Sequence, residues 1–294
     1  MDWLKYKKIY FVFSLTLIFF GVFSLFKWGL KLGIDFKGGS LVEYKIAGTF
    51  STEEVKEKLE EVGYEISSIQ ATLDENYIFR LSSLEFENKE NFTNDLREIV
   101  LEDVTELRFE NVGPAIGPEL IKKTAYAIAI ASSLILIWVA YQFSNLKFGA
   151  AAVLAMFHDF FILVGLYSIL GHIYNAEVDF LFATALLTTL SFSVHDTIVV
   201  FDRIREIIKK QGGEIYQVSN RALSETMVRS LNNSFTILFM LVALLLLGGS
   251  TIKWFAAALL IGTLLGTYSS PFVAVPILVT WDSVAKKIRA RKKA

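Results

Sequence analysis

The sequence predicts a polytopic α-helical membrane protein with six transmembrane helices and a small α+β head domain. Hydrophobic residues make up 53% of the 294 residues, which is more than an ordinary soluble domain carries. Six stretches are each long and apolar enough to cross the hydrocarbon core, which takes about 20 residues in a helix. One further segment, about 29–121, is polar and acidic and alternates between strand and helix periodicities.

The predicted spans follow from the apolar runs. They cover about 9–28, 122–143, 148–170, 178–201, 232–249 and 252–280. No small-residue cleavage site follows the first run, so it is expected to remain as an anchor. The last run contains Pro271 and Pro276 and is expected to be kinked or to end at the interface. The predicted parts are the N-terminus with the first span (1–28), the head (29–121), a five-helix bundle (122–283) with a cytoplasmic loop (202–231), and a basic tail (284–294).

The distribution of Lys and Arg predicts which side each loop occupies. Basic residues gather in the segments that are cytoplasmic if the N-terminus is inside, whereas the short outer loops, 171–177 and 249–253, contain only Lys253. Both termini are therefore expected in the cytoplasm and the head outside. The net charge of −1 gives no reason to expect nucleic acid. The basic tail is expected to contact anionic lipid headgroups, or alternatively a ribosome or channel. The inner basic residues are Lys5, Lys7, Lys8, Lys147, Arg203, Arg205, Lys209, Lys210, Arg221, Arg229, Lys286, Lys287, Arg289, Arg291, Lys292 and Lys293.

The head segment has the element order of a ferredoxin-like fold. Ser51 and Glu54 form a capping box at the start of an amphipathic helix. The order β-α-β-β-α-β is that of a split βαβ domain. The segment shows no Ser/His/Asp set, phosphate loop or metal cluster, and its acidic surface is interpreted as solvation rather than as a site for a basic partner. The predicted strands are 41–46, 65–72, 77–81 and 104–112, with a turn at 74–76 and a second helix at 89–102.

A glycine-rich stretch joins the first span to the head. It contains Gly33, Asp35, Gly38 and Gly39. No Gly-Lys-Ser/Thr ending follows, so a phosphate loop is the weaker interpretation and a tight connection is preferred. The sequence has no Cys, which excludes disulfides and thiolate metal sites. We expect no metal, no cofactor and no enzymatic activity.

The fourth span contains a carboxylate, Asp196, within an apolar run. A charged group at the bilayer centre costs about 2.5–3.5 kcal/mol on insertion scales, so it usually marks an ion path, a proton relay or a buried polar contact. The third span contains His158 and Asp159 about ten residues from its cytoplasmic end, and Arg229 precedes the fifth span. Asp196 lies about 9 Å along the helix from Asp202 at the inner surface. Helix packing is expected to bring these groups together in the cytoplasmic half.

Two motifs carry a resemblance to a known family. Residues 33–40 read Gly-Ile-Asp-Phe-Lys-Gly-Gly-Ser, and residues 195–206 read His-Asp-Thr-Ile-Val-Val-Phe-Asp-Arg-Ile-Arg-Glu at the end of the fourth span. With a head of about 90 residues and five further spans, the chain resembles the SecF branch of the SecD/SecF protein-export family. The resemblance implies half of a resistance-nodulation-division assembly in the cytoplasmic membrane. Such a subunit pairs with six-span SecD near spans three to five, works beside the SecYEG channel, and uses the proton gradient in late preprotein translocation, with Na⁺ left open as coupling ion.

The resemblance also implies roles for individual residues. Asp196 matches the family's proton-transferring carboxylate, and Arg229, in a Thr-Met-Val-Arg-Ser context, matches a functionally linked arginine. An arginine moving toward or away from the carboxylate would switch its affinity for protons. The alternatives are a static hydrogen bond from Asp196 to Thr197 or a neighbouring helix, and an Arg229 that only obeys the positive-inside rule.

The remaining polar residues also have structural interpretations. His158 and Asp159 could only lock the third span to its neighbours. His195 stands where the family more usually has asparagine and is interpreted as a polar packing substitute or an added titrating group. The segment 202–231 is amphipathic and is expected to lie along the membrane surface. Four charged residues are expected to anchor the end of the fourth span: Asp202, Arg203, Arg205 and Glu206.

Glycines in the spans predict close helix packing. Gly262 and Gly266 form a small-xxx-small pattern, and Gly165 and Gly171 allow a weaker version in the third span. Two other functions stay open at this point, a proton-driven exporter of small molecules or lipids and a scaffold without proton movement. The small head leaves little room for the paired outer domains of an exporter.

Overall fold

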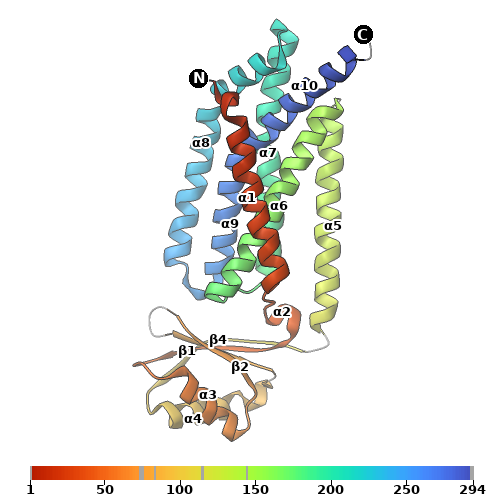
Figure 1. Cartoon of the computed structure of the whole chain (residues 1–294). Helices are drawn as coiled ribbons and strands as arrows, with labels where there is room; N and C mark the ends of the chain where they lie inside the picture. Colours follow the sequence, from red (N-terminus) through yellow and green to blue (C-terminus); the bar gives the residue numbers. More distant parts are fainter. Residues whose placement is uncertain (1, 73–75, 83, 114–115, 144, 292–294) are drawn as a thin grey trace. The chain divides into compact units, whose positions relative to one another are not determined.

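The computed structural model describes residues 2–72, 76–82, 84–113, 116–143 and 145–291. The chain divides into two compact units, one of Leu32–Tyr126 and one of Met1–Lys31 with Ala127–Ala294. The second is a helical bundle and the first is a small α+β unit (Figure 1). In the part of the chain that is described, six helices are long and apolar enough to cross a membrane. The predicted fold class is confirmed.

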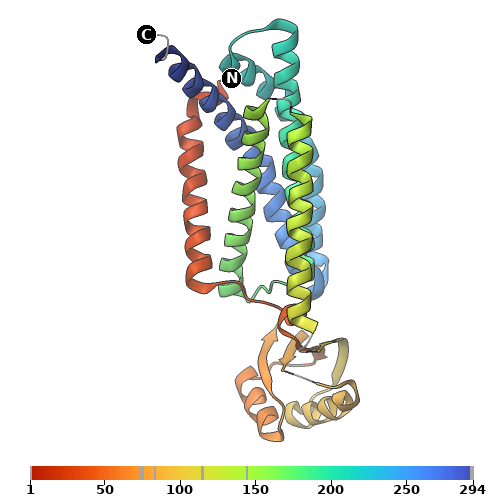
Figure 2. The ribbon, with the colours of Figure 1, turned by 90° about the vertical axis from the view of Figure 1, so that its right-hand side faces the viewer.

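The bundle is built from long helices joined by short connections (Figures 1 and 2). A short 3₁₀ turn precedes the first of them. Each predicted span lies largely within one helix or, for the sixth, within a continuous helical run. The elements are α1 (Lys7–Trp28), α5 (Ile116–Gln142), α6 (Leu146–Tyr174), α7 (Phe180–Gln211), α8 (Ile215–Leu247), α9 (Gly249–Ser269), a π-helical turn η3 (Ser270–Ala274) and α10 (Val275–Arg291).

The segment 202–231, expected as a loop, is mostly helical. α7 continues to Gln211 and α8 begins at Ile215, so only residues 212–214 connect them. The apolar run ends at the expected membrane surface, but buried Ile204 and Ile207 continue the helical period beyond it. Gly212, with φ of 67°, ends α7 in a conformation that favours glycine. Apolar length therefore locates the membrane-embedded part of a helix and not its end.

The sixth span contains the irregularity expected at Pro271. Pro271 has no backbone N–H and cannot make the α-helical hydrogen bond, and here the chain forms a π-helical turn. The axis of α10 is inclined to that of α9 beyond this turn (Figure 1). Pro276 follows in α10, directly after the π-helical turn, and likewise has no backbone N–H to donate.

Glycines allow the helices of the bundle to approach closely. A Cβ atom on Gly21 of α1 would lie 3.2 Å from the Cα of Gly165 on α6. On α9, a Cβ on Gly266 would lie 3.1 Å from the Cα of Ser193 on α7. A Cβ on Gly262 would overlap the side chain of Thr189, also on α7. α5, by contrast, is the least buried of the six spans. Much of its apolar surface is left for lipid or another protein.

The head unit is a four-stranded antiparallel sheet with two helices. The strand order is β2-β3-β1-β4, which with its β-α-β-β-α-β sequence is the ferredoxin-like arrangement. Ser51 caps α3 by accepting a hydrogen bond from the Glu54 backbone N–H at 3.4 Å, as the capping box predicts. Residues 74 and 75 of the predicted turn lie outside the described residues. The elements are β1 (Gly39–Ile46), α3 (Thr52–Val62), β2 (Ile66–Ala71), β3 (Asn76–Leu81), α4 (Lys89–Val100) and β4 (Val104–Val112).

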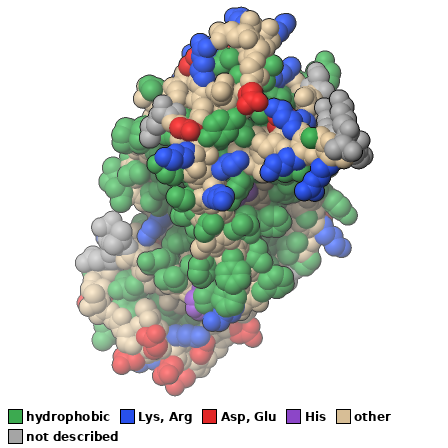
Figure 3. Space-filling model, turned by 45° about the horizontal axis from the view of Figure 1, so that its top comes forward, with side chains coloured by type: hydrophobic (Ala, Val, Ile, Leu, Met, Phe, Trp, Pro, Cys, Tyr) green, Lys and Arg blue, Asp and Glu red, His purple; other side chains and the backbone are tan. Residues whose placement is uncertain are grey.

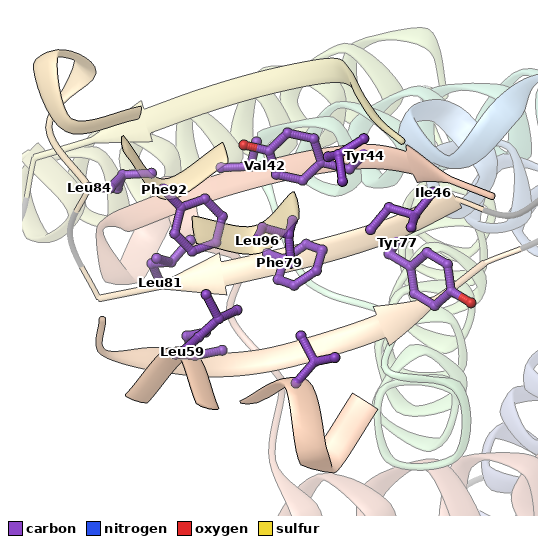
Figure 4. Packing of buried hydrophobic residues seen from close by; sticks show 13 residues of the cluster. Val42, Tyr44, Ile46, Leu59, Tyr77, Phe79, Leu81, Leu84, Phe92 and Leu96 are labelled. Atoms are coloured by element: carbon purple, nitrogen blue, oxygen red, sulfur yellow. The ribbon is translucent and has the colours of Figure 1, made fainter. Parts of the chain in front are cut away.

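Aromatic side chains form the centre of the head core (Figure 4). The rings of Tyr44, Phe79 and Phe92 contact one another with centroids 5.8–6.2 Å apart. Burial raises the pKa of Tyr44 to about 12, although its hydroxyl pairs with Thr93 Oγ1 at 2.7 Å. The head therefore has a hydrophobic core of its own, separate from the bundle.

The glycine-rich stretch contains one helical turn, α2 (Ile34–Lys37), which the sequence interpretation did not include. Gly38 and Gly39 follow with φ of 78° and 114°. A Cβ on Gly39 would lie 2.6 Å from the carbonyl oxygen of Leu81, on the neighbouring strand. Glycine is thus required where the chain enters β1.

Candidate functional site

Asp196 is held at the meeting of three segments of the bundle. It lies on α7 and is 7% exposed. Ser230 of α8 places its hydroxyl 2.8 Å from each carboxylate oxygen. Ser270, in the π-helical turn, also interacts with this carboxylate. The carboxylate is therefore buried with hydroxyl groups as its neighbours.

A second carboxylate, Asp159 on α6, lies in a similar setting. It is 4% exposed. Ser269, the last residue of α9, donates to it at 2.6 Å, and Ser193 of α7 donates to the same oxygen. His158 places Nδ1 2.8 Å from the other oxygen. Three helices thus converge on Asp159.

The surroundings of the two carboxylates meet at Ser270 and Ser193, since Ser270 interacts with Asp196 and donates to the backbone of Ser193, whose hydroxyl donates to Asp159. Ser269 and Ser270 are consecutive, so their side chains point about 100° apart and reach different partners. Ser270 Oγ lies 2.9 Å from Thr197 Oγ1 and donates to the backbone oxygen of Ser193 at 3.3 Å. The Oγ atoms of Ser193 and Ser269 are 3.5 Å apart. We refer to Asp159, Asp196 and these hydroxyl residues (Ser193, Thr197, Ser230, Ser269 and Ser270) as the carboxylate–serine cluster.

The glycines of α9 explain why the cluster forms. Gly266 and Gly262 precede Ser269 by three and seven residues, which puts all three on one face of the helix. That face packs against α7. Without side chains at the glycines, α9 packs close to α7, and Ser269 reaches Asp159 on the adjacent α6. The small-xxx-small pattern therefore positions the site.

The cluster can stabilise a carboxylate in either protonation state. A serine hydroxyl can donate to an ionised carboxylate, or rotate and accept from a neutral one. A buried polar group without a partner costs about 1–3 kcal/mol, and here neither state leaves the carboxylate unpaired. Such a site can take up and release protons. Among the described residues, no group of three or more His, Asp or Glu side chains is arranged to hold a metal ion.

Arg229 and His195, which the sequence analysis placed beside Asp196, do not join the cluster. Arg229 precedes Ser230 on α8 and its side chain is exposed. His195 precedes Asp196 on α7 and is also exposed. Neighbouring residues on a helix point about 100° apart, so both side chains leave the bundle where the next residue enters it. Ser230, which the sequence analysis did not select, is the residue of α8 that meets Asp196.

The charged residues at the end of α7 do form a network. Arg205 pairs with Asp202 at 3.2 Å and also donates to the backbone oxygen of Gln142 at 3.2 Å. Arg203 contacts Glu206 at 2.5 Å and Glu225 of α8 at 2.5 Å. The sequence analysis missed Glu225. The network joins α7 to α8 and to the end of α5.

Two regions of the chain match protein families, and both families are named for SecD and SecF. Residues 92–284 match the C-terminal region of the protein export membrane protein SecD/SecF, and residues 23–47 match the SecD/SecF GG motif. The protein translocase subunit SecF of Thermobaculum terrenum is 39% identical, over 96% of this chain and 94% of that protein. This chain belongs to the SecF family. The family regions include both buried carboxylates and the turn at Gly38 and Gly39.

Longer relatives join a SecF-like part to further sequence. The protein translocase subunit SecDF of Bacillus subtilis is 32% identical over 95% of this chain, which spans 38% of that relative. The crystal structure of SecDF from Thermus thermophilus, described as a translocon-associated membrane protein, superposes with a TM-score of 0.85 at 32% identity. The match covers 96% of this chain and 39% of the SecDF chain. The SecF fold is thus shared with the corresponding part of these SecDF proteins.

Proposed function

We propose that this chain is the SecF half of a proton-driven protein translocase. It pairs with a SecD subunit and promotes late translocation of preproteins through the SecYEG channel. The observation that carries the proposal is Asp196, buried on α7 with hydroxyl partners from α8 and the π-helical turn. Placing a carboxylate inside the membrane is costly, so a carboxylate found there usually has a function.

A proton cycle at Asp196 supplies enough energy for helix motion. One elementary charge crossing 100 mV is worth about 2.3 kcal/mol. Protonation changes which hydroxyls donate and which accept around the carboxylate. Because these hydroxyls belong to different segments, α7, α8 and the π-helical turn shift relative to one another when the proton binds. The chain acts through this motion and not by catalysing a bond change.

The proposed SecD partner covers a polar stripe on the outer face of α7. Thr184, Thr188, Ser191 and His195 are exposed at spacings of four, three and four residues, so they share one face of the helix. Polar residues within a span usually face another helix or water, not lipid. SecDF relatives, in which the SecF-like part belongs to a longer chain, support the same partner.

The proposed orientation puts both termini in the cytoplasm. Lys and Arg side chains gather around the end of the bundle where the two termini lie (Figures 1 and 3). Basic residues mark the cytoplasmic side of a membrane protein. The segment between α1 and α5 then emerges on the outer side, which makes the head extracytoplasmic.

The proposal is tested by neutralising Asp196 in cells that depend on this protein. The variant Asp196→Asn keeps the side-chain size and removes the ionisable group. Asp202→Asn is the matched control. It also removes a carboxylate from α7, but the Asp202 side chain is accessible to solvent. Export of a secreted reporter is measured with and without the membrane potential.

We expect Asp196→Asn to abolish the part of export that depends on the proton gradient and Asp202→Asn to retain it. Unchanged export and unchanged gradient dependence in Asp196→Asn would reduce the chain to a scaffold. The same assay with Na⁺ replaced by K⁺ identifies the coupling ion. Export that fails only when Na⁺ is absent would exclude the proton as that ion.

A further inference from the structure

Trp3 joins the beginning of the chain to α8. It lies in the 3₁₀ turn η1 (Trp3–Tyr6), directly before α1. Its indole Nε1 donates to the hydroxyl of Ser224 on α8 at 3.0 Å. The backbone N–H of Leu4 donates to Asn220 Oδ1, one turn earlier on α8, at 3.1 Å, and the Leu4 side chain is 1% exposed. These contacts on two consecutive turns fix η1 to α8.

The same tryptophan also contacts the π-helical turn. The ring centroid of Phe272, in the middle of η3, lies 6.3 Å from that of Trp3 and 4.7 Å from that of Tyr10 on α1. Tyr268 on α9 completes the group, with its centroid 5.5 Å from that of Phe272. Aromatic rings attract one another at centroid distances of about 4.5–7 Å. Because Phe272 and Ser270 belong to the same short turn, the position of the phenyl ring and that of the serine depend on each other.

These contacts close a loop around Asp196. Its hydroxyl partners are Ser230 of α8 and Ser270 of the π-helical turn. Ser224 lies six residues before Ser230, which is about 9 Å along α8. From Ser224, the side chain of Trp3 leads back to the π-helical turn. The two segments that supply hydroxyls to one carboxylate are therefore joined a second time, through Trp3.

We propose that Trp3 is a positioning residue for Asp196. By joining α8 to the π-helical turn, Trp3 sets the distance between the hydroxyls of Ser230 and Ser270. The inference rests on the proposed function and extends it, because it makes the start of the chain a part of the proton-binding site. When protonation of the carboxylate rearranges these hydroxyls, Trp3 transmits the displacement to the beginning of α1 and of α8.

Trp28, at the other end of α1, provides a matched control. Tryptophan commonly anchors a span at the membrane surface, which is the purely structural role that Trp3 could have. The ring of Trp28 stacks on His172 of α6, with centroids 4.3 Å apart and planes inclined by 10°. α1 has 22 residues and is about 33 Å long, so Trp28 is remote from Trp3 and from the π-helical turn that Trp3 contacts. Trp28→Ala therefore removes the same side chain and an aromatic contact without affecting the proposed loop.

The first measurement is proton uptake by the chain in complex with its SecD partner in liposomes. A pH-sensitive dye inside the vesicles reports the initial rate after a gradient is imposed. Misplacing a reacting group by about 1 Å can cost about 100-fold in rate, so we expect Trp3→Ala, which loosens the loop, to slow uptake by about tenfold. Ser224→Ala removes only the acceptor of the indole N–H and should slow uptake by a smaller factor. Trp28→Ala should stay close to the wild-type rate.

The second measurement separates positioning from anchoring. Infrared difference spectra of the same complex between acidic and alkaline pH contain the C=O stretch of the protonated Asp196 carboxyl, which is identified by its absence in Asp196→Asn. The frequency of this band depends on the hydrogen bonds that the carboxyl group makes. Trp3→Ala should shift the band, because the hydroxyl partners move, whereas Trp28→Ala should not. Loss of an anchor changes the amount of folded protein and leaves the frequency as it is.

The outcomes separate the inference from the proposed function. Absence of proton uptake by the wild-type complex contradicts the proposed function itself. Uptake that Asp196→Asn stops, together with an unshifted band in Trp3→Ala, overturns the positioning role alone. The reductions in rate caused by Trp3→Ala and Ser230→Ala should combine to less than their product, and a full product would assign Trp3 to anchoring. Should Trp3→Ala fail to fold, Ser224→Ala gives the same decision from the band, since the Ser224 side chain is exposed.

Discussion

Replacing Gly262 with alanine tests whether close packing of α9 on α7 builds the carboxylate–serine cluster. The new Cβ atom would lie 2.8 Å from the Oγ1 atom of Thr189 and closer still to its Cβ and Cγ2 atoms. Ordinary van der Waals contact begins at 3.4 Å. Because the overlap includes the Thr189 Cβ atom, a change of rotamer does not relieve it. The two helices must move apart.

The magnitude follows from three effects. Overpacking a close contact costs about 1–3 kcal/mol. Separation of the helices also stretches the hydrogen bond from Ser269 to Asp159, now 2.6 Å long, and a hydrogen bond to a charged group contributes about 1.5–3 kcal/mol. The higher helix propensity of alanine returns about 1 kcal/mol. The net loss is therefore roughly 1.5–5 kcal/mol.

Thermal unfolding of the purified protein measures this loss, and proton uptake in liposomes measures its effect on the site. For large chains, 1 kcal/mol corresponds to about 2–4 °C in Tm, so we expect a decrease of at least about 3 °C. Gly266→Ala should cost less, because its Cβ would lie 3.1 Å from Ser193, a distance that small shifts can relieve. Adding Thr189→Gly to Gly262→Ala should recover much of the stability. A Gly262→Ala protein as stable and as active as wild type would refute the packing argument.

Two further predictions concern the head. Phe92→Ala should destabilise the head by about 3–5 kcal/mol, since it removes a fully buried ring from the core, and limited proteolysis should then cleave within residues 32–126 before it cleaves the bundle. Because the pKa of Tyr44 rises from 10.0 to about 12 on folding, the folded head binds more protons in that interval. The contribution of Tyr44 to the stability of the head is therefore fully present below pH 10 and is lost as the pH rises toward 12. Tyr44→Phe should reduce this fall in an alkaline unfolding series, and an unchanged pH dependence would contradict the assignment.

Much of the fold follows from local patterns in the sequence. The apolar runs locate six spans because crossing a fixed thickness of hydrocarbon requires a fixed length of helix. Alternating apolar residues and the Ser51 capping box locate the head elements to within a few residues. The ends of α7 and α8 could not be placed in this way. Beyond the lipid these helices are polar and are stabilised by ion pairs such as Arg203–Glu225, which join residues distant in sequence.

The candidate site was predicted only in part. Asp196 and Asp159 could be selected from the sequence, because a carboxylate in an apolar run is costly wherever the helix packs. Their hydroxyl partners could not, because a serine in a span is inexpensive and common, and only the register between helices decides which one meets the carboxylate. Ser269 and Ser270 depend in addition on the π-helical turn at Pro271. The Ser-Ser-Pro sequence there is the one local signal that could have indicated them.

The two polar faces of α7 indicate how the proposed assembly couples proton binding to its partner. The inner face carries Ser193, Asp196 and Thr197 and is buried in the bundle, whereas the outer face carries Ser191 and His195 and is exposed. Polar side chains on the outer side of a span usually contact another helix or protein. Any shift of α7 that follows protonation of Asp196 also moves Ser191 and His195 on the outer face. Under the proposed pairing, α7 is the helix that transmits the motion caused by proton binding from SecF to SecD.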